Sequence, residues 1–174
     1  MSKNCEIMSR MKVNYENRNK YFLTRRTPVI IRLDGKAFHT YTRGLNRPFD
    51  EGLIEDMQNT AIYLCQNIQG AKCAYTQSDE ISLLYYAKDA KSQVFFDGRR
   101  DKLVSNLSSI TTYYFNSLSS KMNWVKNGVP AFFDCRVFNT PTKLEAYNYF
   151  LWRERDATKN SISMAAQSVF SHKE

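Results

Sequence analysis

Two pairs of neighbouring residues offer oxygen atoms suited to hold a divalent cation. Asp34 and Gly35 follow an apolar run at residues 29–33. Asp79 and Glu80 lie in a short link between two further runs rich in apolar residues. Mg²⁺ prefers carboxylate ligands, with phosphate oxygens and water completing its coordination shell. If the two acidic sites meet in space, they predict a centre with two metal ions that holds a nucleotide triphosphate.

Neighbouring residues can supply the other contacts of a triphosphate. The Gly35 carbonyl can serve as a backbone ligand, and the missing side chain lets a phosphate approach closely. The backbone amides of residues 35–39 can cradle phosphate oxygens, and the Ser78 hydroxyl can donate a hydrogen bond to the same group. Six basic residues are expected on or near this site: Arg32, Lys36, Arg99, Arg100, Lys102 and Arg136.

Arg136 is the most informative of these cations. It lies in an otherwise apolar, strand-like run, where an unpaired charge is costly. A triphosphate is one partner that suits it, because arginine makes bidentate contacts to phosphate. An ion pair with Asp134 or Asp79 is the alternative.

Each motif alone has an ordinary explanation. Asp-Gly at a strand end is usually a turn, and an Asp-Glu pair in a hairpin link is mostly solvated. A lone histidine such as His39 is more often structural than catalytic. The prediction therefore rests on the combination: both acidic sites fall at expected strand ends, in a basic chain.

The expected secondary structure brings the two acidic sites together. Helices are expected from the N-cap Asp50 to residue 68 and over residues 99–122. Strands are expected at residues 29–33, 71–76, 81–86 and 131–138. This β-α-β-β-α-β order predicts an α+β fold of the ferredoxin-like type. Its first and third strands are central and antiparallel, so Asp34 at the end of one lies beside Asp79 at the start of the other.

Further helices are expected outside this core. A short helix is expected at residues 6–15. Thr142 and Glu145 form a capping-box pattern, which predicts a helix that runs through Arg153. Asp156 is expected to begin a separate helix that continues toward the C-terminus.

Composition bounds the class of protein. The 174 residues suffice for one domain with its own core. Lys and Arg number 25 against 17 Asp and Glu, a formal net charge of +8, which suits a polyanionic partner such as RNA, DNA or a nucleotide. The four cysteines are scattered, without a CxxC motif, which indicates reduced thiols in a cytoplasmic protein. No apolar run approaches the ~20 residues of a membrane span.

Four segments resemble motifs of one known family, the tRNA-His guanylyltransferases and their relatives, the reverse (3′-to-5′) RNA polymerases. RLDGKAFH at residues 32–39 is similar to the family's first metal motif, and QSDEIS at 77–82 to its second. FFDCRVF at 132–138 resembles a third motif, with Cys135 where glycine is usual. YFLWRERDATKNSIS at 149–163 resembles the segment that carries the family's tryptophan-arginine and His-Ile-Asn-Asn motifs.

The resemblance implies one palm-type catalytic domain over residues 1–174, with two Mg²⁺ ions held by Asp34, the Gly35 carbonyl, Asp79 and Glu80. It implies that Asp50 lies near a guanine base. It also implies nucleotide contacts from Asp34, Gly35, Lys36, Ala37, Phe38, His39, Ser78 and Asp79, and triphosphate contacts from Arg99, Lys102 and Arg136. The implied reaction adds a GTP-derived nucleotide to the 5′ end of a tRNA that is already triphosphorylated or is activated by ATP. The resemblance implies a homotetramer.

Two departures from the family pattern affect these expectations. The His-Ile-Asn-Asn motif is replaced by Thr158-Lys159-Asn160-Ser161, which is closer to bacterial and phage-like relatives associated with template-directed repair of 5′-truncated tRNAs. The chain stops at Glu174, whereas relatives continue with a basic part that helps to hold tRNA. A truncated protein that binds nucleotide without turnover is therefore one alternative.

Two other functions fit parts of the pattern. A palm-fold nucleotide cyclase would use similar carboxylates without a tRNA. A non-catalytic RNA-recognition module shares the β-α-β-β-α-β order, but such modules stack bases on exposed strand aromatics. The first strand here carries Ile31, Leu33 and a terminal Asp34 instead.

Overall fold

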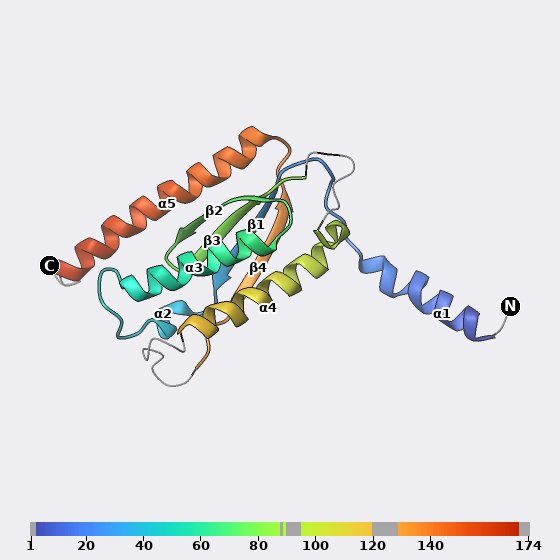
Figure 1. The fold of residues 1–174 in the computed structure, drawn as a ribbon, viewed down its shortest axis with the longest axis horizontal. Helices are drawn as coiled ribbons and strands as arrows, with labels where there is room; N and C mark the ends of the chain where they lie inside the picture. The colour runs from blue at the N-terminus through green and yellow to red at the C-terminus, as the bar shows by residue number, and fades with distance from the viewer. Residues whose placement is uncertain (1–2, 88, 90–94, 120–128, 171–174) are drawn as a thin grey trace.

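The computed structural model describes residues 3–87, 89, 95–119 and 129–170. Its centre is an antiparallel sheet of four strands in the order β2-β3-β1-β4. The strands are β1 (Val29–Gly35), β2 (Ala71–Gln77), β3 (Glu80–Tyr85) and β4 (Phe133–Asn139). Figure 1 shows the sheet between helix α5 on one side and helices α3 and α4 on the other. The expected ferredoxin-like, α+β arrangement is confirmed.

The main core lies between the sheet and helices α3 (Glu51–Asn67) and α4 (Arg100–Ser119). Because side chains alternate along a strand, Val29, Ile31 and Leu33 of β1 all face these helices and are at most 2% exposed. Helix α3 begins where expected, since Oδ1 of Asp50 accepts a hydrogen bond from the Leu53 amide at 3.0 Å.

A smaller apolar cluster joins the opposite face of the sheet to α5 (Lys143–Val169). Its buried members are Ile30 from β1 and Ala146 and Tyr149 from α5. Beyond this cluster, toward the Asp34 end of β1, the same face carries charged and hydroxyl side chains. The sheet therefore has one apolar face and one face that is apolar at one end and polar at the other.

Helix α5 is longer than the sequence pattern predicts. Thr142 caps it as expected, accepting a hydrogen bond from the Glu145 amide at 3.1 Å. The expectation of a break between Arg153 and Asp156 is wrong, because these residues form an i,i+3 ion pair within one continuous helix. No glycine or proline lies between them to end the helix.

A tight connection follows β1 and leads into the short helix α2 (Phe38–Tyr41). Ala37 adopts the left-handed conformation there, with φ of 55° and ψ of 37°. The Phe38 ring turns back toward Gly35 and packs against Tyr41, Phe115 and Phe133, with ring centroids 4.9–5.8 Å apart. This aromatic cluster fixes the backbone directly after Asp34.

The remaining elements lie at the ends of the chain and of the sheet. Helix α1 (Lys3–Asn14) projects away from the sheet in Figure 1, followed by the 3₁₀ turn η1 (Glu16–Asn19). A second 3₁₀ segment, η2 (Phe95–Gly98), precedes α4, and residues 120–122 of the expected helix lie outside the described residues. Within the described ranges, no helix is both long enough and apolar enough to span a membrane.

The cysteines in the described part of the chain agree with the reduced state expected from the sequence. Cys65, Cys73 and Cys135 are free thiols. Burial raises the pKa of Cys135 to about 12, with the negative charge of Asp134 contributing. The Cys135 thiol is therefore protonated and chemically inert at neutral pH.

The buried carboxyl of Asp56 on α3 makes stability depend on pH. Asp56 is 4% exposed, and burial, with a smaller contribution from Glu55, raises its pKa to about 6. Since its pKa in the unfolded chain is near 3.8, the folded protein binds this proton more tightly. Stability from this group is therefore full below pH 4 and is lost as the pH rises through 6. We expect wild type to lose about 2 kcal/mol more than Asp56→Asn between pH 4.5 and 7.5 in urea unfolding. An equal pH dependence of the two proteins would contradict this assignment.

Gly35 and Ala37 should respond to substitution in opposite directions. A Cβ at Gly35 would lie 2.2 Å from the Phe38 ring, so Gly35→Ala must displace that ring and should cost about 1–3 kcal/mol of unfolding free energy. Ala37→Gly removes left-handed strain and should stabilise the fold by about 0.5–1 kcal/mol. Chemical denaturation of both variants provides the test. A Gly35→Ala protein as stable as wild type would show that Phe38 does not fix this turn.

Candidate metal and nucleotide site

The pairing of β1 with β3 brings the two acidic sites together. In their antiparallel register Asp34 lies opposite Glu80, and Leu33 lies opposite Ile81. The Gly35 amide then donates a hydrogen bond to the Asp79 carbonyl at 3.1 Å. Asp34 and Asp79 are thus backbone neighbours at one end of the sheet, as the strand order predicts.

Asp79 occupies the two-residue turn between β2 and β3, after Ser78, whose φ is 49°. Burial raises the pKa of Asp79, and the negative charge of Asp34 raises it further, while hydrogen bonds from the Asp79 backbone and from Ser78 partly oppose the change. A carboxylate whose ionisation is disfavoured in this way, beside a second carboxylate, fits a bound cation, which would relieve both the burial cost and the repulsion at Asp79.

The described ranges contain no group of three or more Asp, Glu, His and Cys side chains arranged to hold a metal. The protein's own donor set at this point is therefore the Asp34 and Asp79 carboxylates with nearby carbonyls. That set fits Mg²⁺, which commonly takes one or two carboxylates and fills the rest of its octahedron with water and substrate phosphates.

A pocket of about 380 Å³ adjoins Asp79. This volume lies within the range of small-molecule sites. Half of the residues expected to contact nucleotide line it, whereas Asp34, Lys36, Asp50, Arg99, Lys102 and Arg136 are not among the lining residues. The two carboxylate oxygens of Asp50 accept hydrogen bonds from the amides of Asn46 and Leu53. The pocket is lined by Gly35, Ala37, Phe38, His39, Thr42, Ser78 and Asp79.

Only part of the expected backbone cradle is available. The Gly35 amide donates to the Asp79 carbonyl and the Lys36 amide donates to the Phe132 carbonyl at 2.8 Å, so both of these amides already have acceptors. Residues 37–39, at the start of α2, keep amides that a helix cannot satisfy internally. The Lys36 side chain is exposed at the same strand end.

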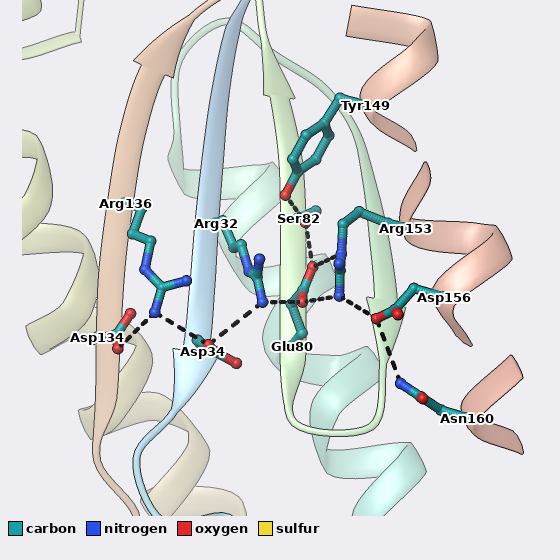
Figure 2. Close-up of polar contacts among 10 residues, drawn as sticks. All are labelled: Arg32, Asp34, Glu80, Ser82, Asp134, Arg136, Tyr149, Arg153, Asp156 and Asn160. Carbon is teal, nitrogen blue, oxygen red and sulfur yellow. Dashed lines mark hydrogen bonds and ion pairs between the residues drawn. The ribbon is translucent and has the colours of Figure 1, made fainter. Parts of the chain in front are cut away.

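Glu80 lies on the α5 face of the sheet, and its side chain is only 4% exposed. Arg153 of α5 holds it with two parallel hydrogen bonds, Nε to Oε1 at 2.8 Å and Nη2 to Oε2 at 2.7 Å. The Ser82 hydroxyl donates to Oε1 at 2.9 Å, and Arg32 Nη2 lies 2.8 Å from Oε2. Both oxygens are therefore already bonded, and Figure 2 shows the carboxylate between Arg32 and Arg153.

Alternating charges continue from Glu80 across the sheet to β4 (Figure 2). Arg32 Nη2 lies 3.5 Å from Asp34 Oδ2, and Arg136 Nη2 lies 3.4 Å from both Asp34 Oδ2 and Asp134 Oδ2. The Arg136 side chain is 53% exposed. The ion pair with Asp134, which the sequence left open as the alternative to a triphosphate, is therefore present. Alternation along β4 points Arg136 away from the core.

The other expected cations lie at the opposite end of the sheet. The Arg100 amide donates to the Tyr21 carbonyl, and Arg99 pairs with Phe22, beside the start of β1. Helix α4 then runs toward the Asp34 end, where Thr112 accepts a hydrogen bond from the Phe133 amide. Within one chain, Arg99, Arg100 and Lys102 therefore lie far from the carboxylates, and the expectation that they lie near them is wrong.

The sequence analysis did not identify the residues of α5 that contact this polar face. Besides Arg153, the Tyr149 hydroxyl lies 2.8 Å from the Ser82 hydroxyl, and Asp156 Oδ2 accepts from Arg153 Nη2 at 3.1 Å. These three residues are spaced i, i+4 and i+7, so they share one side of a helix. An arginine on the buried side of a helix was the signal that could have revealed the network.

Comparison with known proteins agrees with this geometry. A family model described as tRNAHis guanylyltransferase (Thg1) matches residues 8–141. Solved structures of a bacterial tRNA(His) guanylyltransferase (Thg1)-like protein superpose at 44% identity. The complex with GTP has a TM-score of 0.89 over 95% of this chain and 78% of that one. The complex with ATP has a TM-score of 0.90 over 96% and 72%.

A protein of Acanthamoeba polyphaga mimivirus that carries no functional name is 30% identical over 96% of this chain and 64% of its own length. The chain spans about half the length of three further curated relatives. The family model nevertheless covers most of the chain, and the superposition includes nearly all of it. The chain therefore belongs to the tRNAHis guanylyltransferase (Thg1) family.

Proposed function

We propose that this chain is a Mg²⁺-dependent nucleotidyltransferase that adds a nucleotide, typically GTP-derived, to the 5′ end of a tRNA. The observation that carries the proposal is the meeting of Asp34 and Asp79 beside a pocket of about 380 Å³. The family model and the related structures with GTP and ATP support a nucleotide as the occupant of that pocket.

Asp34 and Asp79 are the proposed carboxylate ligands, with the Gly35 carbonyl as a backbone ligand. When bound, Mg²⁺ would supply Lewis-acid stabilisation of charge on phosphoryl oxygens. Glu80 was expected as a further ligand. Since its oxygens already accept hydrogen bonds from Arg153 and Ser82, we assign it the role of orienting the strand end.

The residues that line the pocket would hold the nucleotide. The amides of residues 37–39 would receive phosphate oxygens, with Ser78 as a side-chain donor. Arg136, half exposed and beside Asp34, is positioned to contact a triphosphate by exchanging its aspartate partners for phosphate oxygens. We exclude Arg99 and Lys102 from contacts with a triphosphate bound at the site of the same chain.

The proposed reaction forms one phosphodiester bond. The 3′-hydroxyl of the incoming nucleotide attacks the phosphorus at the 5′ end of the RNA. Pyrophosphate leaves if that end is a triphosphate, and AMP leaves if the end was adenylylated by ATP. A carboxylate at the strand tips can hold the attacking hydroxyl in line and accept its proton.

Two alternatives lose support. An RNA-recognition module would expose aromatic side chains on the open face of its sheet, but here α5 covers part of that face and charged residues occupy much of the rest. A nucleotide cyclase would need the same carboxylates, but the family match favours addition to an RNA end.

We also propose that the protein forms a homotetramer and is located in the cytoplasm. Helix α1 supports assembly, because it projects from the body (Figure 1) and leaves the apolar side chains of Ile7, Met8 and Met11 more than half exposed. The net charge of +8 favours a nucleic-acid partner.

The test is an extension assay with a 5′-triphosphorylated, 5′-truncated tRNA, Mg²⁺ and nucleoside triphosphates. We expect wild type to extend the RNA by at least one nucleotide. Asp34→Asn and Asp79→Asn should each reduce the rate by about 10²-fold or more, because each loses a proposed metal ligand. Chelation of Mg²⁺ should abolish extension.

Asp97→Asn provides a matched control, because Asp97 is exposed and pairs with Arg25 away from the proposed site. It should keep extension within about twofold of wild type, as surface substitutions usually do. Extension that persists in the Asp34 and Asp79 variants would refute the proposed site. Cyclic nucleotide formation without RNA would identify a cyclase, and nucleotide binding without extension would identify a protein without turnover.

A further inference from the structure

The turn that carries Asp79 contains only two residues and is conformationally demanding. Gln77 ends β2, Glu80 begins β3, and these two residues are paired in the sheet register. Ser78 between them has a φ of 49°, a left-handed conformation that residues other than glycine and asparagine seldom adopt. The surrounding structure must therefore stabilise this turn, and with it the direction of the Asp79 carboxylate.

Arg153 contacts the residues on both sides of that turn. Its guanidinium binds Glu80 through two parallel hydrogen bonds of 2.7 and 2.8 Å. With the Gln77 amide oriented to satisfy both of its groups, its oxygen accepts from Arg153 Nη2 at 2.5 Å and its nitrogen donates to the Arg153 carbonyl at 2.6 Å. One side chain of α5 thus links the last residue of β2 to the first residue of β3.

The Arg153 contacts are shielded from solvent, and they carry charge. Arg153 is 4% exposed and Glu80 is 3% exposed. Loss of one partner from an ion pair this deeply buried would leave an unpaired charge in the interior, which is strongly destabilising. The pair therefore holds the Arg153 guanidinium and the Glu80 carboxylate in place. Asp156 Oδ2 accepts from Arg153 Nη2 at 3.1 Å and fixes the arginine on the helix side.

Arg153 also determines how Arg32 divides its contacts. Arg32 Nη2 lies 2.8 Å from Glu80 Oε2 and 3.5 Å from Asp34 Oδ2. Without Arg153, Glu80 would be a buried carboxylate paired with Arg32 alone among the described residues, and Arg32 would be drawn away from Asp34. Both carboxylates of the proposed metal site therefore depend on Arg153, Asp79 through the turn and Asp34 through Arg32.

We infer that Arg153 is a positioning residue for the metal site: it holds the Gln77–Glu80 turn so that the Asp79 carboxylate faces Asp34. This inference rests on the proposed function, because it concerns affinity for the metal at that site. The role assigned to Arg153 is exerted through Glu80 and Gln77, the two residues that it contacts beside the turn.

Arg153→Lys is the first test variant, because it keeps the charge but loses the planar fork that binds Glu80 and Gln77 together. We expect its Kd for Mn²⁺, measured by electron paramagnetic resonance with GTP present, to rise about tenfold, as is typical when a residue that supports a ligand is changed. The Mg²⁺ concentration for half-maximal extension should rise in parallel. Saturating Mg²⁺ should restore most of kcat, and KM for tRNA should stay unchanged.

Gln77→Met is the second variant, because it removes both hydrogen bonds between Gln77 and Arg153 without creating a buried unpaired charge. It should raise the Mn²⁺ Kd about threefold, a smaller effect of the same kind. Arg155→Lys is the matched control, since Arg155 is an exposed arginine on the same helix, and its Kd should match wild type. Thermal melts of all variants establish the folded fraction.

If the role of Arg153 were only structural, Arg153→Lys would lower the melting temperature and the active fraction but leave the Mn²⁺ Kd unchanged. The inference is overturned if Gln77→Met and a folded Arg153→Lys both bind Mn²⁺ within twofold of wild type. If Arg153→Lys does not fold, Gln77→Met alone decides. Equal Mn²⁺ binding by wild type and Asp34→Asn is a separate outcome, which would refute the proposed metal site and this inference with it.

Discussion

The antiparallel pairing of β1 with β3 is the constraint on which the rest of the site depends. This register places Asp34 opposite Glu80 and lets the Gly35 amide bond to the Asp79 carbonyl. Because side chains alternate along a strand, a slip by one residue would turn Ile31 and Leu33 out of the core. The apolar core therefore enforces the meeting of the carboxylates, although none of its side chains belongs to the site.

Charge is arranged so that the chain tolerates acids at the ends of its central strands. Along the α5 face acids and bases alternate from Asp134 to Asp156, which satisfies Asp34 and Glu80 through their neighbours (Figure 2). Asp79 lies outside this line, and burial and the charge of Asp34 raise its pKa. Among the described residues, no ion pair is formed by Asp79, and this is the position where the donor set suits magnesium.

The sequence was sufficient to predict the strand order and the meeting of Asp34 with Asp79. Both follow from local patterns, namely apolar runs, an N-cap at Asp50 and a short hairpin link at residues 77–80, together with one topological rule. The family motifs predicted in addition that the site binds a nucleotide. Several residues of these motifs line the pocket.

Other features depend on three-dimensional contacts that a local pattern does not contain. The charges of Arg99 and Lys102 suit a triphosphate, but α4 begins at the far end of the sheet. Glu80 resembles a metal ligand until Arg153, distant in sequence, is seen to hold it. The break expected after Arg153 is absent because an i,i+3 ion pair with Asp156 favours helix through that point.

The most direct test of this account is anomalous diffraction from crystals grown with GTP and Mn²⁺. We expect an anomalous peak within about 2.5 Å of carboxylate oxygens from both Asp34 and Asp79, with Glu80 still bonded to Arg153. A metal bound only elsewhere, or one whose ligands are Glu80 and Asp134 without Asp79, would contradict the claim that the strand tips form the metal site.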